Sequence, residues 1–216
     1  MPFFVLMKAV LLFNPRSAKS KHRIPNSVLQ VAASIDETHE WEIVDGNMEV
    51  DPWAKIKRLL ETGKFGFFGS TVMPGPQLSQ AIPITRDIHK LFPEIKIIWG
   101  GYFASNQYAT VLDSGYVDFI INGPGDEAFP QLLAAIEQGA ETNEIPNLIY
   151  RKGEETIKTR KGKLPDLDAL PNLPYEKLGA IYPFERYLPN TFLGKKTISY
   201  HSSFGCPFTC SFCAVV

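Results

Sequence analysis

The residues best suited to chemistry are three cysteines near the end of the chain, Cys206, Cys210 and Cys213. They are the only cysteines among its 216 residues. An odd, clustered set is a poor basis for disulfides and a good basis for a metal site. Three thiolates at the spacing C-x3-C-x2-C can wrap one compact cluster. A four-iron cubane held this way keeps one iron open to an outside donor.

Zinc is an alternative occupant of this triplet, and it usually needs a fourth Cys or His to close a tetrahedron. His201 is the only nearby candidate, and its expected place at a strand end does not direct it at the cysteines. In a third interpretation the thiols hold no metal. The spacing favours the open-site iron–sulfur cluster over both alternatives.

The segments upstream alternate between strand-like and helix-like patterns. Residues 8–14 form a continuous apolar run, typical of a strand buried on both faces. The expected strands are 8–14, 41–44, 64–70, 96–99 and 118–121, and the expected helices are 26–35, 51–61, 77–92, 106–114 and 128–138. Asn26 and Asp51 are expected N-caps, with Pro52 at a first helical position. The alternation predicts an α/β fold with a doubly wound, five-stranded parallel sheet.

Unusual loops follow four of the expected strands. They are Asn14-Pro15-Arg16, Ser70-Thr71-Val72, Gly100-Gly101 and Asn122-Gly123-Pro124-Gly125. Open parallel sheets bind ligands beyond the carboxyl ends of their strands. We therefore expect the ligand site at this edge.

The composition changes after the last expected helix. Residues 147–158 predict a β-hairpin, and five prolines between residues 164 and 189 predict an extended, ordered linker. Residues 197–200 predict a new strand. The expected organisation is a ligand-binding domain at 1–142, a hairpin and linker at 143–194, and the start of a further domain at 195–216.

The overall composition is that of an ordinary globular protein, with 44% hydrophobic residues, 21% charged residues and a net charge of −1. This charge gives no case for nucleic-acid binding. No apolar run reaches the roughly 18 residues of a membrane span. We expect a cytoplasmic protein.

The cysteine motif resembles the signature of radical S-adenosylmethionine enzymes. Phe212 precedes the last cysteine, and Gly205 and Pro207 bracket the first. The resemblance implies that the cysteines hold a [4Fe-4S] cluster, with Phe212 beside the cofactor, and that the open iron binds S-adenosylmethionine for reductive cleavage to a radical. It also implies an electron donor such as flavodoxin or ferredoxin. Residues 197–200 would be the first strand of a (β/α) barrel that is then truncated, so this chain alone is expected to be inactive.

The preceding domain resembles the cobalamin (B12)-binding module of the B12-dependent branch of that superfamily, a flavodoxin- or Rossmann-like domain. The matching stretches are 69–77, 99–102 and 117–127. The residues that the resemblance implies for cofactor binding are Ser70, Thr71, Val72, Met73, Gly75, Gln77, Gly100, Gly101, Tyr102, Asn122, Gly123, Gly125, Asp126 and Glu127. Ser70 would donate to the buried nucleotide tail, and the two adjacent glycines would let that tail pass close to the backbone. Met73 would pack in the core or at the corrin edge, or would contact the cobalt face.

The chain also departs from the cobalamin pattern. Many cobalamin proteins carry Asp-x-His-x-x-Gly after the first strand, whereas His22 is the only histidine in that loop and its spacing is wrong. The resemblance then implies cobalt without a histidine ligand. Pro124 also replaces an acidic residue of the usual Gly-Glu-Gly-Glu, which leaves one polar contact near the corrin in doubt.

The resemblance implies radical methylation of an unactivated centre in an unknown small-molecule substrate. Two alternatives remain, namely a radical cyclase or ring-rearranging enzyme, and a cobalamin carrier or sensor without catalysis. The three cysteines argue against the carrier. A radical methylthiotransferase would need three more cysteines upstream, and residues 1–205 contain none.

Overall fold

The computed structural model describes residues 8–17, 22–200 and 210–211, and within them it contains one seven-stranded sheet. The strands are β1 (Ala9–Asn14), β2 (Trp41–Asp45), β3 (Phe65–Thr71), β4 (Lys96–Gly100), β5 (Phe119–Ile121), β6 (Leu148–Lys152) and β7 (Glu155–Lys158), in the spatial order β2-β1-β3-β4-β5-β6-β7. The first five strands pair in parallel, which confirms the predicted α/β fold. The predicted hairpin, β6 and β7, extends the same sheet in antiparallel sense beside β5.

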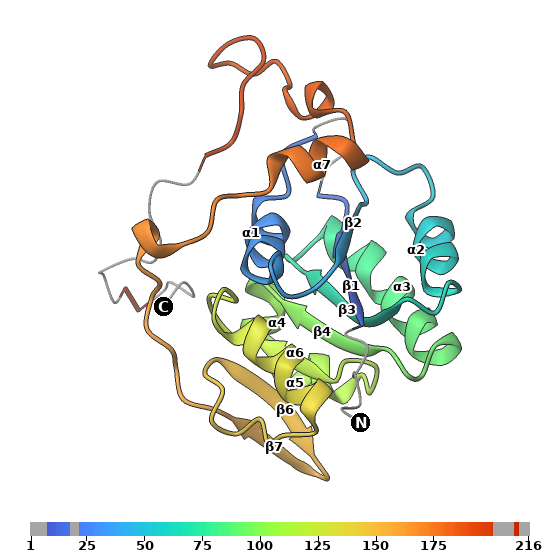
Figure 1. Ribbon diagram of the computed structural model, residues 1–216, viewed down its shortest axis with the longest axis vertical. Helices are drawn as coiled ribbons and strands as arrows, with labels where there is room; N and C mark the ends of the chain where they lie inside the picture. Colours follow the sequence, from blue (N-terminus) through green and yellow to red (C-terminus); the bar gives the residue numbers. More distant parts are fainter. Residues whose placement is uncertain (1–7, 18–21, 201–209, 212–216) are drawn as a thin grey trace, which may run out of the picture.

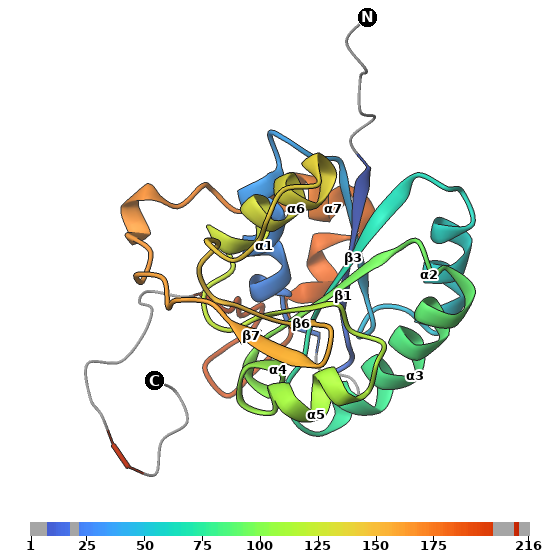
Figure 2. The ribbon, with the colours of Figure 1, turned by 90° about the horizontal axis from the view of Figure 1, so that it is seen from below.

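Helices cover both faces of the sheet. They are α1 (Asn26–Ile35), α2 (Pro52–Leu60), α3 (Pro76–Leu91), α4 (Tyr102–Asn106), α5 (Tyr108–Asp113), α6 (Ala128–Gln138) and α7 (Tyr175–Ile181), with 3-10 turns η1 (Leu167–Ala169) and η2 (Phe184–Tyr187). In Figure 2, α1, α6 and α7 lie on one face of the sheet, and α2 and α3 lie on the other. Two hydrophobic cores fill the space between the layers. Every residue of β1 is buried, which explains its continuous apolar sequence.

Two residues were predicted to be helix N-caps, and one of them is. The side chain of Asp51 accepts a hydrogen bond from the backbone N–H of Ala54, so its predicted role as N-cap is confirmed. Asn26 is instead the first residue of α1, after Pro25, and its amide Nδ2 donates to the Ser199 carbonyl at 3.3 Å. The Asn26 side chain therefore serves a tertiary contact rather than a cap.

Two predictions for the end of the chain are wrong. The proline-rich linker contains α7, because the side chains of Leu178, Tyr182 and Tyr187 are buried in the same hydrophobic core as residues of α1 and β2. Residues 197–200 do not form a strand. A strand requires a neighbouring strand for its hydrogen bonds, and no described segment pairs with these residues.

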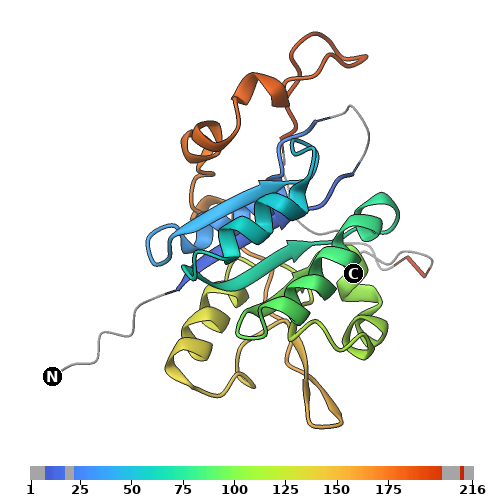
Figure 3. The same cartoon turned by 90° about the vertical axis from the view of Figure 1, so that its right-hand side faces the viewer.

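The linker crosses the whole sheet. After β7 it runs back past the other strands to α7, which lies beside β2 (Figure 1). The hairpin and the segment around α7 consequently occupy opposite ends of the molecule (Figure 3). Among the described residues no helix is long and apolar enough to cross a bilayer.

Candidate functional site

Sheet register brings the predicted loops to one edge. Ser70 in β3 lies opposite Phe13 of β1 on one side and Trp99 of β4 on the other. Thr71 pairs with Gly100, and Asn14 pairs with Asp45 of β2. All five parallel strands thus end at this carboxyl edge, as predicted.

Ser70 carries a buried, unpaired hydroxyl at this edge. The residue is only 5% exposed, and its hydroxyl Oγ has no hydrogen-bonding partner among the described residues. A buried hydroxyl left unpaired costs about 1–3 kcal/mol. Such a group needs an explanation, and a bound polar ligand at the strand end supplies one.

Gly101 is required where the loops after β3 and β4 meet. Its φ of +86° lies in the left-handed region, and a Cβ there would come within 2.9 Å of Thr71 Oγ1 and 3.0 Å of the Val72 nitrogen. The Val72 N–H donates to the Gly100 carbonyl at 3.0 Å, and the Phe103 N–H donates to the Val72 carbonyl at 3.0 Å. These bonds fasten the two loops to each other.

Gly100 differs from its neighbour because it has space beside it. The nearest atom to a Cβ at Gly100 would be the Ile121 carbonyl oxygen, at 4.0 Å. The backbone at the end of β4 is therefore open to a close approach from outside. Tyr102, half-buried, follows as the first residue of α4.

The loop between β3 and α3 is held in shape by Gln77. The buried Gln77 side chain accepts from the Met73 N–H at 2.7 Å and donates to the Pro15 carbonyl at 3.0 Å. Met73 itself is 48% exposed at the edge, so its side chain is open to a ligand. The side chain of Val72 is buried in the core, and Gly75 lies in an open turn with φ of +94°.

The loop between β5 and α6 supplies the remaining predicted residues. The Asn122 N–H donates to the Asn147 carbonyl at 2.7 Å, and Lys161 Nζ donates to the Asn122 carbonyl at 3.0 Å. Gly123 has a φ of +131°, a conformation in which a residue with a side chain would be strained. The shape of this loop thus depends on Asn147 and Lys161. Both residues follow α6 in the chain, and the sequence analysis did not identify either.

Asp126 and Glu127, at the end of that loop, have different environments. Burial raises the pKa of Asp126, although its own backbone N–H and the Gln30 amide act in the opposite direction. Its Oδ1 has no partner among the described residues. Glu127 is exposed and accepts from Gln131 of α6 at 3.1 Å.

A buried carboxylate at the end of β2 was not singled out by the sequence reasoning. Asp45 is fully buried, and its Oδ1 accepts from Asn14 Nδ2 and from the N–H and Nδ2 of Asn47, each at 2.9 Å. Its Oδ2 accepts from the hydroxyl of Tyr187 at 3.0 Å. The sequence analysis identified Asn14 as a polar residue at a strand end. Asn14 pairs with Asp45 across β1 and β2, and this pairing was the signal that could have identified Asp45.

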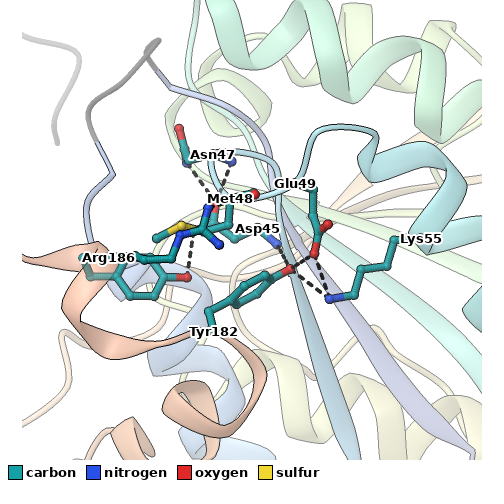
Figure 4. Close-up of polar contacts among 8 residues, drawn as sticks. Asp45, Asn47, Met48, Glu49, Lys55, Tyr182 and Arg186 are labelled. Atoms are coloured by element: carbon teal, nitrogen blue, oxygen red, sulfur yellow. Dashed lines mark hydrogen bonds and ion pairs between the residues drawn. The ribbon is translucent and has the colours of Figure 1, made fainter.

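A second set of contacts fixes the segment around α7 to the loop after β2 (Figure 4). The Tyr182 hydroxyl donates to Glu49 Oε1 at 2.7 Å and accepts from Lys55 Nζ at 3.1 Å. Burial alone would raise the pKa of Glu49, but hydrogen bonds from Lys55 and Tyr182 outweigh it and hold that pKa below its usual value. Arg186 donates to the Met48 carbonyl at 3.3 Å.

The predicted cluster ligands fall mostly beyond what the structure describes. Cys206, Cys213 and Phe212 lie outside the described residues, and Cys210 is exposed. The cluster and its contact with S-adenosylmethionine therefore remain predictions.

Comparison with known proteins gives a family match for most of the sheet. The model of the B12-binding domain matches residues 18–133. An anaerobic magnesium-protoporphyrin IX monomethyl ester cyclase of Synechocystis is 26% identical over 132 residues, covering 60% of this chain and 25% of the relative. An uncharacterised methyltransferase of Pyrococcus horikoshii is 22% identical over 216 residues, covering 97% of this chain and 45% of the relative. The chain thus spans less than half the length of these relatives.

Solved structures share the fold. The cobalamin-dependent S-adenosylmethionine radical enzyme OxsB, with aqua-cobalamin and S-adenosylmethionine bound, superposes with a TM-score of 0.72 at 16% identity, covering 84% of this chain and 26% of OxsB. The radical S-adenosylmethionine methyltransferase TsrM of Kitasatospora setae gives 0.62 at 21% identity, covering 71% of this chain and 30% of TsrM.

Proposed function

Because the chain belongs to the B12-binding domain family, we propose that it binds cobalamin at the carboxyl edge of its sheet and forms the leading part of a radical S-adenosylmethionine enzyme. The observation that carries the first half is the unpartnered hydroxyl of Ser70 beside the open backbone of Gly100. The cysteine spacing C-x3-C-x2-C carries the second half.

The described residues fit a corrin with a nucleotide tail. Ser70 offers a hydrogen-bond donor at the end of β3, and the space beside Gly100 admits a ligand against the backbone. Gly101 and Gln77 keep the two flanking loops in place by the close contacts given above. The exposed Met73 offers an apolar surface for the corrin edge.

The cysteine loop would hold a [4Fe-4S] cluster through Cys206, Cys210 and Cys213, with one iron open to S-adenosylmethionine. Cobalamin, cluster and S-adenosylmethionine together would supply radical methyl-transfer chemistry. The chain's own contribution is to bind and orient these groups. A reductant such as flavodoxin or ferredoxin would deliver the electron.

Methylation of an unactivated centre is the activity we favour, because a methyltransferase of Pyrococcus horikoshii matches almost the whole chain. A radical cyclase is the second candidate, because several relatives are named as cyclases at 26–28% identity. Detection of a methylated product, as against a ring-closed one, would distinguish these two candidates.

Anaerobic reconstitution with iron, sulfide and cobalamin tests both halves of the proposal. We expect a corrin absorption spectrum that stays with the protein and about four irons per chain, as a cubane requires. Cys210→Ala should lower the iron content and leave the cobalamin affinity unchanged. Ser211→Ala, next to it and also exposed, is the matched control and should retain the iron.

Zinc in place of iron, or an unchanged iron content in Cys210→Ala, would contradict the cluster. Cobalamin bound without any cluster would support the carrier or sensor instead. Failure to retain cobalamin would contradict the first half of the proposal.

A further inference from the structure

Three buried polar atoms without partners occur where the start of α1 faces the loop between β5 and α6. They are Oδ1 of Asn26, Nε2 of Gln30 and Oδ1 of Asp126, none of which is hydrogen-bonded within the described part of the chain. Asn26 is only 8% exposed. Buried polar groups are nearly always paired, so three neighbouring exceptions indicate a missing partner.

The local geometry brings these groups to one place. Asn26 and Gln30 are four residues apart on α1 and therefore share one face of the helix. The Gln30 amide faces the Asp126 carboxyl and favours its ionised form. Even so, neither Gln30 Nε2 nor Asp126 Oδ1 has a described partner at both hydrogen-bonding distance and angle. The loop packs directly on the helix, since a Cβ at Gly125 would lie 3.3 Å from Val31 Cγ2.

The unpaired atoms define the chemistry of the missing group. Asn26 Nδ2 already donates to the Ser199 carbonyl, so its oxygen is left as an acceptor. With Asp126 this makes two acceptors, and Gln30 adds one donor. A phosphate would meet the Asp126 carboxylate unfavourably, and a metal cation would meet the N–H groups of Gln30 unfavourably. A neutral group that both donates and accepts satisfies all three atoms.

We propose that Asn26, Gln30 and Asp126 form a subsite for a neutral donor–acceptor group of the bound cobalamin. This inference rests on the proposed function, because the subsite lies at the carboxyl edge to which cobalamin is assigned. Cobalamin carries two groups of this chemistry, the carboxamides around the corrin and the ribose hydroxyls of the nucleotide tail.

The first test separates a binding role from a structural one. At neutral pH the desolvated carboxylate of Asp126 costs folding free energy, so Asp126→Asn should raise the thermal midpoint of the ligand-free chain by about 2–4 °C. The gain should disappear as the pH falls toward the ordinary carboxyl pKa of 3.8, because the wild-type group is then protonated. The same variant should weaken cobalamin binding about tenfold, since a charge-assisted bond becomes a neutral one.

Two further variants complete this test, with absorbance titration as the readout. Asn26→Leu should also weaken cobalamin binding. Asp168→Asn, which removes an exposed carboxylate far along the linker, should change neither the thermal midpoint nor the affinity. A structural role for Asp126 predicts the opposite sign, with a lower midpoint in Asp126→Asn.

The second test distinguishes the two sources of the group. Cobalamin derivatives in which one corrin carboxamide is hydrolysed to a carboxylate should include one that binds the wild type about tenfold more weakly, through repulsion by Asp126. Asp126→Asn should remove that penalty for this derivative alone. If a ribose hydroxyl is the partner, all carboxylate derivatives should bind alike, and the effect of Asp126→Asn should vanish for cobinamide, which lacks the tail.

Either pattern supports the subsite. If cobalamin binds the wild type and Asp126→Asn and Asn26→Leu bind it equally well, the subsite is wrong while the proposed function stands. If the wild type does not bind cobalamin, the proposed function itself fails.

Discussion

At the scale of single residues, the carboxyl edge contains groups that stability alone does not explain. Ser70 and Asp126 bury polar atoms without partners in the described chain. By contrast Asp45, two strands from Ser70 along the same edge, has four hydrogen-bond donors around it. Residues that violate the pairing rule are expected mainly at functional sites. The contrast therefore separates the unpaired atoms, which the proposed cobalamin site would use, from the paired carboxylate of Asp45, which stabilises the fold.

Ser70→Ala should separate cobalamin affinity from stability. The change removes a hydroxyl that has no partner in the described chain, so the free energy of unfolding without ligand should not fall. The dissociation constant for cobalamin should rise about tenfold, because one hydrogen bond to the ligand is lost. Thr110→Ala, at an exposed position of α5, is the control and should leave both quantities unchanged.

The measurements are urea unfolding for stability and absorbance titration for affinity. A loss of stability in Ser70→Ala with unchanged cobalamin affinity would show that the hydroxyl serves the core and not a ligand.

Sequence reasoning found Ser70, Gly100 and Gly101 because strand ends and turn glycines have local signatures. Gly101 indeed needs its positive φ and has no room for a side chain. It could not find Asp45 with Tyr187, because that contact joins residues 142 positions apart. The same holds for Gln30 with Asp126, whose proximity depends on how α1 packs against the loop. Long-range packing is not encoded in short-range patterns.

At the scale of elements, the segment around α7 shares a hydrophobic core with the sheet. Proline placement suggested an extended linker, yet Pro174 and Pro183 only flank α7 and do not enter it. Leu178, Tyr182 and Tyr187 are buried against α1 and β2, so tertiary packing selects the helix. As a result, the chain leading toward the cysteines is fixed to the end of β2.

Tyr187→Phe should loosen this segment. It leaves the buried Oδ2 of Asp45 without its hydroxyl donor, so the free energy of unfolding should fall by about 1–3 kcal/mol. Limited proteolysis should then cut near residues 183–189 faster than in the wild type. Tyr200→Phe, at a position that is 82% exposed, should match the wild type in both assays. Equal cleavage rates in Tyr187→Phe and the wild type would contradict the anchoring role of Tyr187.

At the scale of the whole molecule, the sheet carries the proposed cobalamin site at its carboxyl edge, and the chain that follows the sheet leads to the cysteines. The five parallel strands and most helices could be predicted, because apolar residues recur with regular periods and helix ends carry characteristic residues. The extension of the sheet by β6 and β7 and the missing strand at 197–200 could not, since strand pairing depends on which neighbours are present. Crossing from β7 back to α7, the linker brings the residues before the cysteines next to α1 through the Asn26–Ser199 contact.

Hydrogen–deuterium exchange with and without cobalamin tests most directly whether the corrin binds at the carboxyl edge. The account predicts slower exchange in the loops after β3, β4 and β5, at residues 70–77, 100–106 and 122–127, and at the start of α1. It predicts no change at the opposite edge, at residues 36–40, 61–64 and 92–95. Protection at that opposite edge, or none anywhere despite bound cobalamin, would contradict it.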